Sequence, residues 1–240
     1  MSYDYSENIL VQESAGHLLV DELGWQVELA YNQEVLGENG TFGRSSYKDI
    51  LLVRYFQKAL RTLNPWITDA QVTEAQNTFE KHLSSASLMQ INEEKYAYIR
   101  DGIPVTEKKP NGQTEEKRAI IIDFQHPNDM ERNHFLAVKE MKIHGDLYRR
   151  RTDIVGFVNG IPLLFIELKK NSVDVQNAYT DNYTDYLDTI PQLFYYNAFL
   201  MLSNGVEAKV ATLGSKYEFF HEWKRLSEQE QGSVALETML

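Results

Sequence analysis

The chain of 240 residues contains no cysteine, which removes disulfide bonds, thiolate nucleophiles and cysteine-ligated zinc from its possible chemistry. The absence of disulfides is compatible with a reducing compartment, so we expect a cytoplasmic location. No run approaches the ~20 consecutive apolar residues that span a bilayer. The opening residues, MSYDYSE, lack the basic start and apolar core of a signal peptide. We therefore expect neither membrane insertion nor secretion.

Net positive charge is also missing, because 24 Lys and Arg stand against 35 Asp and Glu, for a net charge of −11. Bulk charge thus does not indicate nucleic-acid binding, and any contact with phosphates requires a local basic patch. The composition that is present, with 42% hydrophobic and 25% charged residues, is typical of a soluble globular protein. A chain of this length can form one domain that is stable without a metal or a disulfide.

The first hundred residues have the spacing and capping signals of helices. Apolar residues recur at helical spacing over 7–23 and over 50–60. A capping box predicts a third helix over 68–84, and a shorter helix is expected over 93–100, before Gly102.

From residue 103 onward, short β-favouring runs alternate with turn residues. We expect strands or strand pairs at 119–122, 135–138, 153–158, 161–169, 199–203 and 206–212, with a helix over 173–188. This order predicts an α/β fold with a mixed central β-sheet flanked by helices and an N-terminal helical region. We expect one domain over 1–225, helical to about 101 and sheet-forming over about 102–215, with 226–240 as a tail or linker stub.

Three charged residues stand in the most apolar part of the sequence, the predicted hairpin around Asn159-Gly160. Glu167 and Lys169 share one face of a strand, because side chains alternate along it. A strict two-residue turn places Asp153 on the opposite face. A three-residue turn, or an equivalent bulge, places Asp153 directly across from Glu167, and we predict one of these.

Two converging carboxylates suit Mg²⁺, which takes oxygen ligands and a substrate phosphate. A neighbouring lysine can hold the attacking water and balance phosphate charge. This set describes metal-assisted phosphodiester hydrolysis by Asp153, Glu167 and Lys169. The spacing alone leaves open the alternative that these residues are an ion-paired end of a sheet.

Residues 150–170, RRTDIVGFVNGIPLLFIELKK, resemble the nuclease core in the N-terminal region of the restriction, or motor, subunit of type I restriction enzymes. The similarity covers most of residues 1–225 and extends to the segments 98–105, 122–124, 133–135, 190–194 and 203–205. It implies a restriction-endonuclease-like fold of the PD-(D/E)xK superfamily. It also implies that Asp153 and Glu167 are metal ligands and that Lys169 is the catalytic lysine.

The resemblance implies further site residues. An acidic residue on the first helix belongs to the family pattern, and Glu7 is the best match for this third metal ligand, although a first-turn helix-dipole partner is the simpler interpretation. Family members carry Gln-x-x-x-Tyr on a helix after the lysine, implicated in handling DNA and in coupling. Asn182 and Tyr186 occupy that position here, with asparagine in place of glutamine.

Basic residues beside the predicted hairpin can offset the net negative charge locally. We expect Arg150, Arg151 and Lys170 to contact nucleic acid, together with Asn182 and Tyr186. The lysines of the preceding hairpin, over 108–117, are better explained as solvated loop charge.

The resemblance implies a Mg²⁺-dependent DNA endonuclease domain, with Mn²⁺ able to substitute, that cuts after ATP-driven translocation by motor domains outside this chain. The chain has no P-loop, and the glycines of 37–43 lack the required lysine, so ATP is expected to act only on the full-length subunit. The implied partners are double-stranded DNA and the methyltransferase and specificity subunits. Two alternatives stay open: a non-catalytic module that docks DNA or the methyltransferase, and a free-standing nuclease of the same fold.

Overall fold

A seven-stranded mixed β-sheet organises the protein, in the order β1-β4-β7-β8-β9-β10-β11. The computed structural model describes residues 3–222, with side chains from residue 11 onward, so the predicted tail at 226–240 lies outside the described residues. The elements are α1 (Tyr3–Asp21), β1 (Gln26–Leu29), α2 (Val53–Leu63), α3 (Asp69–Glu80), α4 (Leu88–Asp101), β2 (Ile103–Lys108), β3 (Thr114–Ala119), β4 (Phe135–Lys139), β5 (Lys142–His144), β6 (Arg149–Arg151), β7 (Ile154–Val158), β8 (Ile161–Leu168), the π-helix η1 (Ala178–Tyr183), α5 (Thr184–Thr189), the 3₁₀ helix η2 (Pro191–Phe194), β9 (Phe199–Ser203), β10 (Ala208–Ala211), the 3₁₀ helix η3 (Tyr217–Phe219) and β11 (His221–Glu222).

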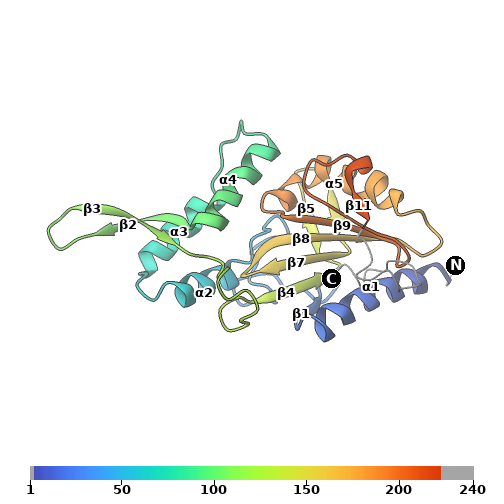
Figure 1. Cartoon of the computed structure of the whole chain (residues 1–240), viewed down its shortest axis with the longest axis horizontal. Helices are drawn as coiled ribbons and strands as arrows, with labels where there is room; N and C mark the ends of the chain where they lie inside the picture. Colours follow the sequence, from blue (N-terminus) through green and yellow to red (C-terminus); the bar gives the residue numbers. More distant parts are fainter. Residues whose placement is uncertain (1–2, 223–240) are drawn as a thin grey trace.

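The sheet is covered on both faces, which explains the near-continuous apolar sequence of β7 and β8. On one face, α1 packs Val11, Ala15 and Leu19 against side chains of β4, β7 and β8. On the other face, η1 and α5 contribute Tyr183 and Tyr186 to the larger core cluster. Figure 1 shows α1 and α5 on opposite sides of the strands. The prediction of a mixed central sheet flanked by helices is confirmed.

Helix boundaries follow the capping residues. Thr68 forms the predicted capping box with Gln71, so α3 begins at Asp69. A second capping box, made by Ser87 and Gln90, begins α4 earlier than the sequence analysis expected. Gly102, with a φ of 84°, ends that helix as predicted. Among the described residues, no helix is long and apolar enough to cross a membrane.

Three local predictions were wrong. Residues 26–29 form β1, which lies within the range expected to be helical and pairs in parallel with β4. The strand expected over 119–122 ends at Ala119, because the Asn64 side chain bonds both the N–H and the C=O of Ile120 and takes the place of a partner strand. The helix expected over 173–188 is a turn followed by η1 and α5.

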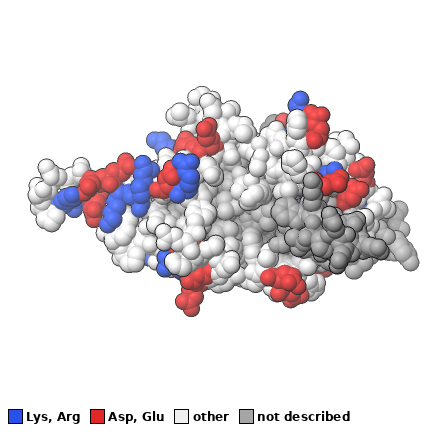
Figure 2. Space-filling model, in the orientation of Figure 1, with Lys and Arg blue, Asp and Glu red and all other residues white. Residues whose placement is uncertain are grey.

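The β2–β3 hairpin projects from the body of the protein (Figure 1) and carries charges of both signs. Figure 2 shows acidic and basic side chains side by side along it. The ion pairs are Lys109–Glu115, Lys117–Glu107 and Arg118–Glu116. Because neighbouring acids neutralise these cations, the hairpin does not form a basic patch, in agreement with the interpretation as solvated charge.

Candidate active site

The register of the β7–β8 hairpin decides whether the two carboxylates meet. Asn159 and Gly160 have φ angles of 52° and 80° and form a two-residue turn, so Val158 pairs with Ile161. The three-residue turn is therefore wrong. The equivalent bulge is confirmed, because the register shifts between Gly156 and Phe157.

The bulge lies on β8 next to Pro162. Phe157 pairs with Pro162 whereas Gly156 pairs with Leu164, so the residue between them has no partner of its own. Proline lacks the N–H that a regular ladder requires, which favours a bulge at this point. Beyond the bulge Ile154 pairs with Ile166. The next step of an antiparallel register brings Asp153 across from Glu167.

The carboxylate of Asp153 lies at the entrance of β7 and is half-buried. Its Oδ2 accepts a hydrogen bond of 2.7 Å from the backbone N–H of Leu168, which ties it to the end of β8. Burial raises the pKa of Asp153 from its ordinary value of 3.8 to about 6, although the Leu168 N–H and the charge of Lys169 act in the opposite direction.

Glu167 is the more enclosed of the two acids, with 2% of its surface exposed. Its Oε2 is buried without a hydrogen-bond partner among the described residues. Burial and the neighbouring charge of Asp153 raise the pKa of Glu167 well above its ordinary value. Two acids in such a place favour a bound proton or a bound cation between them.

Lys169 lies on the same side of β8 as Glu167. Its side chain forms a hydrogen bond with the helical layer that covers the sheet. Its ammonium donates to Oδ1 of Asn182, in η1. The Asn182 amide is 3.4 Å from the hydroxyl of Tyr186, which itself donates to the backbone C=O of Arg151 over 2.9 Å. Asn182 and Tyr186, separated by four positions, thus connect the lysine to the strand that precedes Asp153.

A π-helical turn, which is wider than an α-helical turn, places Asn182 beside Lys169. The π-helix η1 spans residues 178–183 and is continuous with α5. Such π turns within helices are frequent at functional sites because they redirect one side chain. Tyr186 is 4% exposed and packs in the core, so its ring is not available to stack on bases.

Helix α1 supplies one residue that the sequence analysis missed. The side chain of Gln12 is buried and donates to the backbone C=O of Asp153 over 3.2 Å. The sequence signal for Gln12 was its position next to Val11, on the buried side of a predicted helix. Glu7 belongs to the same helix, but its side chain lies outside the described ones, so its role as a ligand stays a prediction.

The predicted DNA-binding arginines already have protein partners. Arg150 pairs with Asp185 of α5 through two hydrogen bonds, one of them 2.8 Å long. Arg151 is 3.3 Å from a carboxylate oxygen of Glu140 and lies over the ring of Tyr31. Lys170, two residues after the end of β8, is half-buried. Arg151 is thus the more exposed of the two arginines.

The donor set of the site fits a hard divalent cation. It offers carboxylate oxygens from Asp153 and Glu167, including the buried oxygen that has no hydrogen-bond partner. No group of three or more His, Cys, Asp or Glu side chains gathers among those that the structure describes. The two carboxylates therefore leave the remaining ligand positions to water, substrate oxygens or residues outside that set.

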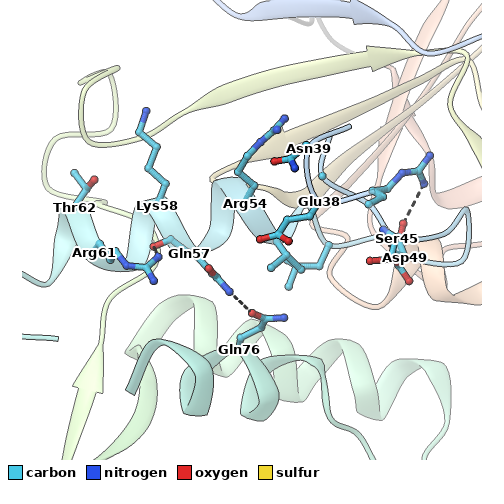
Figure 3. Close-up of a pocket in the computed structure, with 14 residues that line it drawn as sticks. Glu38, Asn39, Ser45, Asp49, Arg54, Gln57, Lys58, Arg61, Thr62 and Gln76 are labelled. Atoms are coloured by element: carbon cyan, nitrogen blue, oxygen red, sulfur yellow. Dashed lines mark hydrogen bonds between the residues drawn. The ribbon is translucent and has the colours of Figure 1, made fainter. Parts of the chain in front are cut away.

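A cavity of about 750 Å³ lies at the other end of the hairpin. The backbone N–H of Leu52, just before α2, donates to the C=O of Gly160 in the hairpin turn, remote from Asp153. Figure 3 shows that Gln57 reaches Gln76 across this cavity, which Lys58 also lines. The cavity is thus separate from the carboxylate pair.

Comparisons with known proteins identify the family and several relatives of this chain. The family model described as "Type I restriction enzyme R protein N terminus" matches residues 4–219. The type I restriction enzyme HindI endonuclease subunit of Haemophilus influenzae is 30% identical over 218 residues, which make up 89% of this chain and 20% of that subunit.

Two further relatives are more distant. The putative type I restriction enzyme MjaIXP endonuclease subunit of Methanocaldococcus jannaschii is 29% identical over 80% of this chain and 18% of its own length. The SauCOLORF180P endonuclease subunit of Staphylococcus aureus is 25% identical over 46% of this chain and 11% of its own length. The chain spans a fifth or less of each of these three relatives. It belongs to the family of type I restriction enzyme R protein N-terminal regions.

Proposed function

We propose that this chain is the Mg²⁺-dependent DNA endonuclease domain of a type I restriction enzyme, with a PD-(D/E)xK core. The observation that supports the proposal most directly is the bulged register that sets Asp153 across from Glu167, with Lys169 on the same side of β8. Membership of the family and the likeness to named endonuclease subunits support it independently. We propose that residues 1–225 form the single nuclease domain.

In this proposal Asp153 and Glu167 hold the metal. Glu167 presents its buried Oε2, and the hydrogen bond from Leu168 fixes the orientation of Asp153. Glu7 is the proposed third carboxylate, from α1. A bound Mg²⁺ supplies Lewis-acid polarisation of the phosphate and lowers the pKa of water. Mn²⁺ is expected to substitute, because it also takes oxygen ligands.

Lys169 is the proposed catalytic lysine. Its ammonium lies beside the carboxylates, close enough for its charge to lower the pKa values of both Asp153 and Glu167. From this position it holds the attacking water and balances negative charge on the phosphate. Asn182 is a positioning residue, because it accepts the lysine's hydrogen bond rather than contacting the reacting atoms.

The wider activity rests on parts of the protein beyond this chain. We propose that DNA is cut after ATP-driven translocation by motor domains, and that ATP binds there rather than to this chain. The proposed partners are double-stranded DNA and the methyltransferase and specificity subunits, and the proposed location is the cytoplasm. DNA selection would then belong to the specificity subunit, so this domain cuts without sequence preference.

Calorimetric titration of Mg²⁺ or Mn²⁺ tests the metal site without requiring the motor. We expect the wild-type chain to bind metal, and Asp153→Ala to lose binding while circular dichroism shows a folded protein. The exposed residue Asp188 provides the matched control, because Asp188→Ala removes an equal charge outside the proposed site. Unchanged metal binding by Asp153→Ala would contradict the proposal and favour a docking module.

A further inference from the structure

The β5–β6 ribbon has two different faces. His144 pairs with Arg149 and Lys142 pairs with Arg151, so these four side chains share one face. The alternate positions face the protein: Ile143 is fully buried. One face of the ribbon is therefore anchored, and the other is basic.

The anchoring is specific enough to hold the ribbon in place. Arg150, which pairs with Ile143 across the ribbon, forms its two hydrogen bonds to Asp185 of α5. The backbone N–H of His144 donates to the C=O of Tyr47, and the C=O of His144 accepts from Gln192. The ribbon is thus a supported element rather than an isolated loop.

The tip of the ribbon exposes two large side chains. Leu147 is 88% exposed and Tyr148 is 51% exposed, and they are adjacent in the sequence. The guanidinium of Arg150 lies 5.0 Å from the centre of the Tyr148 ring, which limits the positions of that ring. Together the two side chains form a small exposed surface at the end of the ribbon, where a partner can contact them.

The ribbon concentrates cations although the whole chain carries a net charge of −11. Arg150 pairs with Asp185, Arg151 with Glu140 and the nearby Lys48 with Asp146, whereas Lys142 and Arg149 add positive charge to the same face. Burial lowers the pKa of His144, and so do four surrounding cations, Arg149, Arg44, Lys142 and Lys48. Within residues 142–151, four Lys and Arg side chains accompany one acidic residue, Asp146. A partner that suits this face carries negative charge.

We propose that the β5–β6 ribbon is a duplex-DNA contact element, with Lys142, Arg149 and Arg151 on phosphates and the Leu147–Tyr148 tip in the groove. The inference rests on the proposed nuclease function, which it deepens by naming a DNA-contacting surface. A two-stranded ribbon fits the major groove of B-DNA, which is about 12 Å wide. Apolar tips can contact thymine methyl groups or base steps without reading a defined sequence.

Position along the chain favours DNA over an acidic protein. Arg151 ends the ribbon and Asp153 follows two residues later. The tip at Leu147 is six residues from Asp153. Extended strands rise about 3.3 Å per residue, so the tip reaches at most about 20 Å from the carboxylates, or about six base pairs. One duplex can therefore contact both.

The test measures binding of a fluorescein-labelled 30-base-pair duplex by anisotropy, in EDTA, from 50 to 200 mM KCl. We expect Arg149→Gln to weaken binding about fivefold or more and to lower the logarithmic salt slope by about 0.9, the value for one lost phosphate contact. The double variant Leu147→Ser, Tyr148→Ser is expected to weaken binding about fivefold with an unchanged slope, because no charge is removed. Lys108→Gln, an exposed cation outside the ribbon, is the matched control and keeps wild-type affinity.

Metal calorimetry on the same proteins separates the two proposals. If Arg149→Gln and the tip variant bind DNA as wild type does, or if the wild type does not bind the duplex at 50 mM KCl, the ribbon proposal is overturned and metal binding still tests the nuclease. If the ribbon variants lose DNA affinity while wild-type protein binds no metal, the ribbon proposal stands and the nuclease function fails. Loss of affinity in the ribbon variants with metal binding intact supports both.

Discussion

Replacing Asp153 by asparagine is expected to stabilise the metal-free protein at pH 7.5, although it removes a proposed metal ligand. Asp153 and Glu167 lie next to each other in a largely buried site, where burial disfavours the charged form of both acids and the charge of Asp153 further disfavours that of Glu167. Asparagine keeps the size of the side chain and can accept the hydrogen bond from Leu168, while it removes one of the two charges.

The magnitude follows from the pKa of Asp153. Its rise from 3.8 to about 6 corresponds to about 3 kcal/mol of unfavourable free energy in the charged form, at about 1.4 kcal/mol per pKa unit. Because part of the side chain is exposed, solvent screening makes this value an upper limit. We expect Asp153→Asn to increase the free energy of unfolding by about 1–3 kcal/mol at pH 7.5.

The effect of Asp153 on the pH dependence of stability is opposite in sign to that of most carboxylates. A raised pKa means that the folded protein binds more protons than the unfolded chain between pH 3.8 and about 6, so stability falls as pH rises through this interval. Burial lowers the pKa values of His134 and His144, which has the opposite effect near pH 6.5. Both histidines are present in the variant, so the difference between the two proteins isolates the carboxylate pair.

Urea denaturation followed by circular dichroism, at pH values from 5 to 7.5 in EDTA, measures this difference. The variant's advantage is expected to increase with pH across the range. Saturating Mg²⁺ is expected to reverse it, because metal at 100 times its dissociation constant stabilises the folded wild type by about 2.7 kcal/mol. A variant that is less stable than wild type at every pH would refute the reasoning about the buried Asp153 charge.

Four further changes have defined outcomes. In the full-length subunit, Lys169→Ala is expected to abolish DNA cleavage while metal binding by this chain persists in calorimetry, and cleavage by the full-length variant would contradict the role of the lysine. Deleting Leu163 removes the extra residue of the bulge and leaves Glu167 across from Asp153 in a regular hairpin, so metal binding should persist in calorimetry when circular dichroism shows a folded sheet. Thr68→Ala should cost about 1 kcal/mol in urea denaturation, because it removes the N-cap hydrogen bond of α3. Phe165→Ala, at a fully buried position, should cost about 3–5 kcal/mol in the same measurement.

Local signals in the sequence predicted elements whose stabilising contacts lie within a few residues. The capping box at Thr68, the terminal Gly102 and the Asn159-Gly160 turn each depend on side chains or backbone angles close to them. β1 was missed because its four residues become a strand only by pairing with β4, more than a hundred residues later.

The candidate site combines both kinds of information. Charged residues in an apolar hairpin identified Asp153, Glu167 and Lys169, and alternation along a strand put the last two on one face. The contribution of Gln12 from α1 was not predicted, nor was the hydrogen bond between Lys169 and Asn182. These contacts join segments that are distant in the sequence and have no local pattern.

The sequence by itself determined the chemistry that is available: no thiols, a hairpin with two acids and a lysine, and basic residues beside it. The tertiary structure decided which of these groups meet. A single bulge beside Pro162 sets the register, and the partners of Arg150 and Arg151 turn one arginine inward and leave the other exposed. Such choices depend on long-range packing and pairing, because a shift of one residue on a strand moves a side chain to the opposite face.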